Sequence, residues 1–214
     1  MKIQLALDRM EIADAIKLTQ LVEESIDWVE VGTSLIKEFG IHSVKELKQV
    51  FPHKTIVADI KTIDNARYEF EMCFQAGADV ATVMGVSPLV TIDACMEVAK
   101  KYNKKVMIDL LNTSEEQKRE LLRYQDAIFC VHVSKDEQET LGAQNRGSQE
   151  SSGFFQKAGV ELAAAGGITL DSIEGLQKSL CSSVVIIGSA ITKANNPSEA
   201  AAKFKEIGLQ LEGV

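Results

Sequence analysis

The sequence lacks several features that mark particular classes of protein. Asp and Glu number 31 against 23 Lys and Arg, so the formal net charge is -8, and the basic excess typical of nucleic-acid binding is absent. No apolar run approaches the roughly 18 residues that a membrane span requires. The first residues reach Asp8 before any apolar segment of signal-peptide length develops. We therefore expect a cytoplasmic protein with neither a nucleic-acid nor a membrane partner.

Cysteine is scarce, and no two cysteines form a C-x-x-C pair. The cysteines are Cys73, Cys95, Cys130 and Cys181. Each lies in an apolar or helical segment, which favours buried free thiols over disulfides or a zinc site. The length of 214 residues suits one sizeable hydrophobic core and is short for two domains. We expect a single domain over residues 1–214.

What the chain does contain is a series of short β-rich segments, most of them separated by segments of helical periodicity. The β-rich segments are IQLALD, DWVEVGT, TIVADIK, DVATVMG, KVMIDLL, AIFCVHV, VELAAAGG and SVVIIGSA. They are almost entirely apolar, as expected for a parallel sheet covered on its outer face. Two architectures fit this pattern, a closed barrel and an open doubly wound sheet.

Polar residues and glycines at the strand ends favour the barrel. These residues are Asp8, Glu30, Asp59, Lys61, Asp109, His132, Gly167 and Gly188. An open sheet would concentrate such residues at one switch point, whereas a barrel brings every strand end to one mouth. The sequence therefore predicts an α/β protein with a single-domain (β/α)8 TIM barrel.

Helix boundaries and one irregular segment can also be predicted. Ser43, with Glu46 three residues later, and Ser114 have the spacing of helix N-caps. The segment 138–158 is rich in Gly, Ser, Gln and Asn, which predicts a loop. We expect at most a short sixth helix there, around residues 149–157.

The strongest local signal is the run Asp59-Ile60-Lys61-Thr62-Ile63-Asp64 at the end of the third strand. Strand alternation would place Asp59 and Lys61 on one face, pointing into the barrel mouth, with Asp64 in the loop beyond. Two flanking carboxylates keep a lysine protonated, and a fixed ammonium can stabilise an anion or deliver a proton. The alternative is a surface ion-pair cluster without a catalytic role.

This motif resembles the signature of the orotidine monophosphate decarboxylase superfamily, and the resemblance extends through nearly the whole chain. The other segments that carry it are LALD, VEVGT, GADVATVMG, AAAGGI and GSAITKANNP. Within that superfamily the sequence is most similar to the 3-hexulose-6-phosphate synthases and next to the 3-keto-L-gulonate-6-phosphate decarboxylases.

The resemblance implies that Glu30 and Asp59 hold Mg²⁺, or Mn²⁺ in its place. Mg²⁺ prefers a few carboxylates and completes its coordination with water and substrate oxygens. The alternative for Glu30 is an ion pair with Lys61 and no metal. Asp8 and Asp109 are expected to shape the mouth and to hydrogen-bond sugar hydroxyls, unless Asp109 serves only as a partner of Lys61.

His132 is the only histidine at a strand end, whereas His42 and His53 are expected at the surface. The resemblance implies a general base at His132, and imidazole suits proton transfer near neutral pH. The alternative is a histidine with a purely structural role.

Glycine-rich turns after the seventh and eighth strands predict a phosphate site. Gly166-Gly167 and Gly188-Ser189 would let backbone N–H groups approach an anion where barrels often bind phosphate. Alternatively, these residues only form strand-to-helix turns.

The resemblance implies one of two lyase reactions. A synthase removes the C1 proton of D-ribulose 5-phosphate and adds the Mg-stabilised 1,2-enediolate to formaldehyde, whereas the decarboxylase forms its enediolate by losing CO₂. Asp109, the TVMG segment and Lys135 favour the synthase, because the decarboxylase family has glutamate and arginine at the positions of Asp109 and Lys135. Ser134 and Ser189 depart from the synthase pattern, which usually has glycine at both positions.

Two further expectations concern ligands and assembly. An alternative from a different functional class is a non-catalytic barrel that binds a sugar phosphate. The resemblance also implies a homodimer with shared active sites, in which Asp64 reaches into the site of the partner. The alternative is that Asp64 caps the following helix of its own chain.

Overall fold

The computed structural model describes residues 1–134, 136 and 153–212. Its strands form a closed parallel barrel in chain order, from β1 to β8. The strands are β1 (Lys2–Leu7), β2 (Trp28–Val31), β3 (Thr55–Thr62), β4 (Val80–Met84), β5 (Lys105–Asp109), β6 (Ile128–His132), β7 (Glu161–Ala165) and β8 (Val184–Ile187). The predicted (β/α)8 barrel is confirmed.

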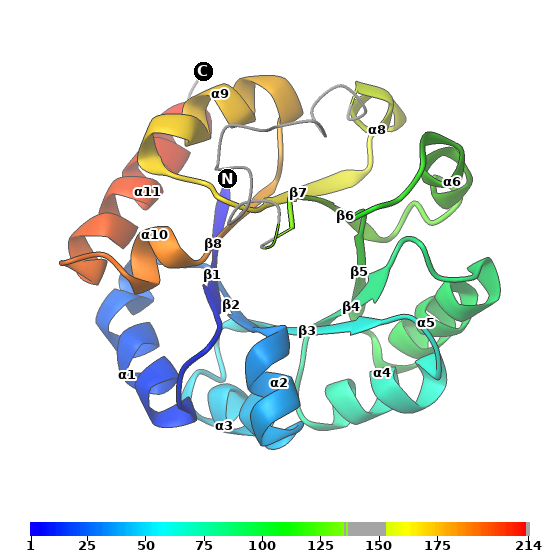
Figure 1. Cartoon of the computed structure of the whole chain (residues 1–214), viewed down its shortest axis with the longest axis horizontal. Helices are drawn as coiled ribbons and strands as arrows, with labels where there is room; N and C mark the ends of the chain where they lie inside the picture. The colour runs from blue at the N-terminus through cyan, green and yellow to red at the C-terminus, as the bar shows by residue number, and fades with distance from the viewer. Residues whose placement is uncertain (135, 137–152, 213–214) are drawn as a thin grey trace.

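Helices surround the strands as an outer ring (Figure 1). They are α1 (Ile12–Val22), the 3-10 helix η1 (Glu23–Ser25), α2 (Thr33–Phe39), α3 (His42–Val50), α4 (Ala66–Gln75), α5 (Leu89–Tyr102), α6 (Glu115–Leu121), α8 (Gly153–Ala158), α9 (Leu170–Leu180), α10 (Ser189–Thr192) and α11 (Pro197–Glu212). Within the described ranges, no helix combines the length and the apolar character needed to cross a membrane.

Strand β1 closes the barrel by pairing with both β2 and β8. Gln4 lies opposite Trp28 on one side and opposite Ile186 on the other. Each strand therefore has two hydrogen-bonded neighbours, and the barrel has no open edge. Because all strands run in the same direction, their carboxyl ends meet at one mouth.

The apolar strands bury side chains on both faces. Those that face the helices join one large core cluster, and the others fill the barrel interior. The interior cluster contains Trp28, Val57, Val80, Met107, Ile128, Cys130, Ala163, Val184 and Ile186. Burial on both faces explains why the strands do not alternate between apolar and polar residues.

Three of the four cysteines are buried free thiols, as predicted, but Cys181 is exposed. Cys181 follows the last residue of α9 and has a φ of 48°, in the left-handed region where helices often end. The prediction of burial was wrong there because this turn lies at the surface.

The helix caps agree with prediction at one position and differ at another. Ser114 forms a capping box with Gln117 at the start of α6. Ser43 does not cap α3, which begins at His42; its hydroxyl instead donates to the carbonyl of Gly40 at 2.8 Å. Of the segment 138–158, α8 is described, and the remaining predictions for that segment lie outside the described residues.

Candidate active site

The end of β3 departs from regular strand geometry. The pairing of β3 with β4 shifts register between Ala58 and Thr62, and Lys61 has a φ of 51°. This left-handed conformation is uncommon for a residue other than glycine and marks a bulge. The predicted placement of Asp59 and Lys61 on one face is nevertheless confirmed, because the two side chains meet at the mouth while Ile60 between them packs against the outer core.

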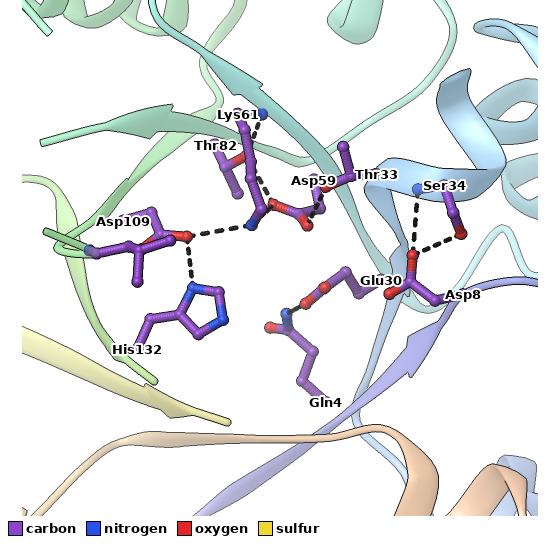
Figure 2. Close-up of polar contacts among 11 residues, drawn as sticks. Gln4, Asp8, Glu30, Thr33, Ser34, Asp59, Lys61, Thr82, Asp109 and His132 are labelled. Carbon is purple, nitrogen blue, oxygen red and sulfur yellow. Dashed lines mark hydrogen bonds and ion pairs between the residues drawn. The ribbon is translucent and has the colours of Figure 1, made fainter. Parts of the chain in front are cut away.

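Lys61 is a half-buried ammonium held between two carboxylates (Figure 2). Its Nζ donates to Oδ1 of Asp59 at 2.9 Å and to Oδ2 of Asp109 at 3.1 Å. Burial alone would lower the pKa of Lys61, but the negative charges of Asp59 and Asp109 outweigh it and raise the pKa above its ordinary value. Lys61 therefore stays protonated across the physiological pH range.

Asp59 is fixed by two hydroxyl groups in addition to Lys61. Thr33, at the start of α2, donates to Oδ2 at 2.7 Å, and Thr82 on β4 donates to Oδ1 at 3.0 Å. Only 7% of Asp59 is exposed. The carboxylate is thus held in a single orientation by partners from α2, β3 and β4.

Asp109 joins Lys61 to His132. Its Oδ2 lies 2.8 Å from Nδ1 of His132, and its Oδ1 accepts from the backbone N–H of Leu111 at 2.9 Å. Burial alone would raise the pKa of Asp109, but the hydrogen bond and charge of His132, followed by Lys61, lower it to about 2. An ionised Asp109 can only accept, so in the neutral imidazole Nδ1 carries the proton and Nε2 keeps a free electron pair.

Glu30 on β2 is a buried acid beside Asp59. The side-chain amide of Gln4 donates to Oε2 of Glu30. Burial and then the charge of Asp59 raise the pKa of Glu30 to about 8. Oε1 of Gln4 is buried and has no hydrogen-bond partner among the described residues. A cation bound beside Glu30 would therefore stabilise its ionised form and could also contact Oε1 of Gln4.

The donor set around Glu30 and Asp59 fits a divalent cation. Two acids from neighbouring strands lie close enough for one charge to raise the pKa of the other, and a hard cation relieves that repulsion. The ion pair between Glu30 and Lys61 that we considered is not among the ion pairs of the described residues; Lys61 contacts Asp59 and Asp109 instead. The described part of the chain holds no group of three or more His, Cys, Asp or Glu arranged for a metal, so waters and substrate oxygens would complete a Mg²⁺ shell here.

Asp8 follows β1 and lies at the edge of the mouth, where its side chain contacts the first turn of α2. Its Oδ1 accepts from the backbone N–H of Ser34 at 3.1 Å and from the hydroxyl of Ser34 at 2.7 Å. A Cβ on Gly32 would lie 2.3 Å from the same oxygen. Glycine at position 32 is thus required for Asp8 to take this position.

Asp64 is exposed beyond the end of β3, as predicted, and does not join the cluster of its own chain. Its Oδ1 accepts from the N–H of Asn65 at 2.7 Å. The N-cap of α4 is Asn65, in the left-handed region, and not Asp64. The alternative in which Asp64 caps this helix is therefore wrong.

The glycine turns that we assigned to phosphate follow the adjacent strands β7 and β8. Gly166 and Gly167 have φ values of 100° and 63°, and a Cβ on Gly166 would lie 2.4 Å from the carbonyl oxygen of Val133. Close packing thus accounts for Gly166 on structural grounds. Gly188 precedes α10, which begins at Ser189, and a Cβ there would meet nothing closer than 3.8 Å.

Sequence reasoning did not identify four polar partners of these acids: Gln4, Thr33, Ser34 and Thr82. Threonine in a strand is explained by its β propensity alone, so Thr82 gave no separate signal. Gln4 was detectable in principle, because it is a polar residue within an otherwise apolar strand. His42 and His53 pair with surface glutamates, as their predicted positions imply, and Lys135 lies outside the described residues.

The fold and the site together define a class of protein. A closed (β/α)8 barrel with an acid–lysine–histidine cluster at its strand ends has the architecture of a TIM-barrel enzyme. The model of the orotidine 5'-phosphate decarboxylase / HUMPS family matches residues 1–204. The chain belongs to this family.

Curated relatives and solved structures agree with that membership. The chain is 36% identical to 3-hexulose-6-phosphate synthase from Bacillus subtilis, over 98% of this chain and 100% of the relative. It is 32% identical to 3-keto-L-gulonate-6-phosphate decarboxylase UlaD from Escherichia fergusonii, over 99% and 98% of the two chains. The crystal structure of 3-hexulose-6-phosphate synthase from Salmonella typhimurium superposes with a TM-score of 0.90 at 32% identity, covering 99% of this chain and 100% of that one. Both activities are carbon–carbon lyases, and this chain is an enzyme of that class.

Proposed function

We propose that the protein is a Mg²⁺-dependent aldolase of the 3-hexulose-6-phosphate synthase type, which joins formaldehyde to D-ribulose 5-phosphate. The observation that carries the proposal is the bridging carboxylate of Asp109, which lies 3.1 Å from Nζ of Lys61 and 2.8 Å from Nδ1 of His132. One acid therefore orients both a fixed cation and a base. The first relatives named above support the synthase assignment.

His132 is the proposed general base. Because Asp109 accepts the proton on Nδ1, the free electron pair of the neutral ring lies on Nε2. This nitrogen removes the proton from C1 of ribulose 5-phosphate, which leaves a 1,2-enediolate. Because the tautomer and the orientation of this base are fixed before the substrate binds, the reaction does not need to order the imidazole in the transition state.

Lys61 is the proposed electrostatic stabiliser of the enediolate. Its raised pKa keeps the positive charge in place, and partial burial strengthens its attraction for an anion that forms beside it. The bulge at the end of β3 allows this ammonium to lie between Asp59 and Asp109.

Glu30 and Asp59 are the proposed Mg²⁺ ligands, and the positions of their hydrogen-bond donors support this. Gln4 donates to one oxygen of Glu30, and Thr33 donates to Oδ2 of Asp59, so neutral groups orient the oxygens that face away from Lys61. When bound, Mg²⁺ supplies a Lewis acid that polarises the sugar carbonyl and lowers the charge of the acid pair. Mn²⁺ is expected to substitute.

The bond-forming step balances without a further reactant. C1 of the enediolate donates its electron pair to the carbonyl carbon of formaldehyde, and the formaldehyde π bond becomes an alkoxide. The proton that His132 removed from C1 is the proton that this alkoxide requires. The product is a hexulose phosphate with one new carbon–carbon bond.

The remaining side chains of the mouth are proposed to bind the substrate. Asp8 lies at the edge of the mouth with one oxygen held by Ser34, and its other oxygen is proposed to accept from a sugar hydroxyl. The turns at Gly166-Gly167 and Gly188-Ser189 follow the adjacent strands β7 and β8. They are proposed to bind the phosphate through backbone N–H groups.

A homodimer with shared sites is part of the proposal. Asp64 is exposed and makes no contact with Lys61 in its own chain. Large apolar side chains are exposed beyond the ends of β3 and β4: Ile63 at 57%, Tyr68 at 66% and Val90 at 73%. A second subunit covering this face would bury them and bring its own Asp64 to the mouth.

Two measurements on purified protein test the function. Turnover of ribulose 5-phosphate with formaldehyde is expected to exceed turnover of 3-keto-L-gulonate 6-phosphate, the substrate of the alternative decarboxylase. Mg²⁺-dependent exchange of solvent deuterium into C1 of ribulose 5-phosphate, without formaldehyde, is expected because His132 acts before the second substrate. Preferred decarboxylation would reassign the chain to the second activity, and binding of ribulose 5-phosphate without exchange would indicate a non-catalytic barrel.

A further inference from the structure

We propose that Thr82 is a positioning residue, whose single hydroxyl group holds the backbone of Lys61 and the carboxylate of Asp59 in the geometry that catalysis uses. The inference rests on the proposed function, because it concerns how the acid–lysine pair is kept in place. Thr82 lies on β4, is 3% exposed and touches neither C1 nor the phosphate in the scheme above.

The pairing of β3 with β4 is interrupted beside Thr82. Ala58 is in register with Ala81, but the next paired residues are Thr62 and Val83. Residues 59–61 on β3 therefore have only position 82 opposite them on β4. A regular ladder cannot satisfy every backbone group across such a mismatch, and a buried N–H without a partner is costly.

Thr82 supplies the missing acceptor. The backbone N–H of Lys61 donates to Oγ1 of Thr82 at 2.8 Å. The side chain thus replaces a strand-to-strand hydrogen bond at the residue that adopts a φ of 51°. Without this acceptor, the left-handed conformation of Lys61 loses a specific stabilising contact.

The same hydroxyl also orients Asp59. A hydroxyl has one donor and two acceptor sites, and Thr82 uses its donor toward Oδ1 of Asp59 at 3.0 Å. Nζ of Lys61 donates to that same oxygen at 2.9 Å. The backbone of Lys61, the hydroxyl of Thr82, the carboxylate of Asp59 and the ammonium of Lys61 form one closed ring of contacts (Figure 2).

This ring fixes both ends of Lys61 through one group. With Oδ1 of Asp59 engaged by two donors, Oδ2 has only Thr33 as its described partner and retains capacity for a cation. Loss of the hydroxyl is therefore expected to loosen the ammonium and the metal-binding carboxylate together. A threonine that served only to pack the strand would produce neither effect.

Substitutions that separate the hydroxyl from the shape of the side chain test this inference. Thr82→Val keeps the branched shape and removes the hydroxyl; Thr82→Ser keeps the hydroxyl and removes the methyl group. Thr82→Ala against Thr82→Ser repeats the comparison with smaller side chains, if the valine variant fails to fold. Thr19→Val is a matched control, because Thr19 is a buried helical threonine whose hydroxyl donates to the carbonyl of Ala15, in α1 and outside the proposed site.

Three measurements are made on each full-length protein: kcat and KM with ribulose 5-phosphate and formaldehyde, Mg²⁺ affinity by calorimetry, and hydrogen exchange of the Lys61 amide by NMR. Thr82→Val is expected to lower kcat and Mg²⁺ affinity by roughly 10- to 100-fold, the usual cost of losing a group that orients a metal ligand. KM should change little, and the Lys61 amide should exchange faster. Thr82→Ser and Thr19→Val should resemble the wild type in all three measurements.

Wild-type kcat and Mg²⁺ affinity in Thr82→Val would overturn the inference. Equal losses in Thr82→Ser and Thr82→Val would also overturn it, because packing and not the hydroxyl would then be responsible. If the wild-type protein itself does not catalyse the reaction, the proposed function fails, and the amide exchange still decides the role of Thr82. Faster exchange at Lys61 in the valine variant alone supports that role, and unchanged exchange refutes it.

Discussion

Nζ of Lys61 lies 2.9 Å from Oδ1 of Asp59, two positions earlier in the same strand. In a regular strand two such side chains point to the same face but stand apart along the strand axis. The bulge brings them into direct contact, so the cation and the acid form a single unit at the mouth.

Removing this cation is expected to abolish most of the turnover without unfolding the protein. Lys61→Ala should lower kcat by about 10²-fold or more, because an enediolate beside Asp59 and Asp109 would form without its stabilising charge. Lys17→Ala is the control, since Lys17 is an exposed partner of Asp14 on α1. Steady-state kinetics and circular dichroism check the expectation, and near wild-type turnover in Lys61→Ala would remove Lys61 from the mechanism.

The Asp109–His132 hydrogen bond is expected to control the protonation of the base. Asp109→Asn presents an amide that can donate to Nδ1, which favours the tautomer with its proton on Nε2 and so blocks the base. We expect kcat to fall by roughly 10²-fold or more, as in other sites where an acid orients a histidine. Deuterium exchange into C1 should fall in parallel; retained exchange would show that another group removes the proton.

The raised pKa of Glu30 predicts how stability depends on pH and on Mg²⁺. Burial and the charge of Asp59 raise the pKa of Glu30 from its ordinary value of 4.5 to about 8 in the folded chain. The folded state therefore holds a proton that the unfolded state releases, and the contribution of Glu30 to stability is full below pH 4.5 and is lost as the pH rises through about 8. In chelator, Glu30→Gln should gain stability relative to the wild type across this window.

Thermal unfolding from pH 4.5 to 8, with and without Mg²⁺, measures both effects. Mg²⁺ binds the ionised acids, so it should raise the Tm of the wild type most at the upper end of this range. The variant Glu30→Gln should lose most of this rise, and the exposed Glu38→Gln should keep it. An equal rise in all three proteins would place the cation elsewhere, and full activity after exhaustive chelation would exclude a required metal.

A mixing experiment tests the shared site of the proposed homodimer. Asp64→Ala and Lys61→Ala chains, each inactive alone, should regain roughly a quarter of the wild-type activity when they are refolded together. Random pairing gives about half heterodimers, each with one intact composite site. Heterodimer formation is verified by native mass spectrometry, and verified heterodimers without activity would assign Asp64 to a role in its own subunit.

The sequence was sufficient to predict the barrel and the residues at its mouth. Few folds bring the ends of eight apolar parallel strands together at one place. The positions of Glu30, Asp109 and His132 at strand ends therefore predicted that these residues would meet at the mouth. The bulge could not be predicted, because a left-handed lysine has no local sequence signal and is stabilised by a contact from another strand. The same reason hid Gln4, Thr33 and Thr82, whose importance depends on what lies opposite them.

The seam between β1 and β8 has a consequence for biosynthesis. Lys2 lies opposite Val184 in the finished barrel, so β1 acquires its second neighbour only after β8 has been synthesised. The residues of the mouth on β2 to β6, such as Lys61 and His132, are synthesised before β8. During that interval the barrel around them is still open. During translation β1 therefore presents an unpaired edge, which the finished fold removes when β8 pairs with it.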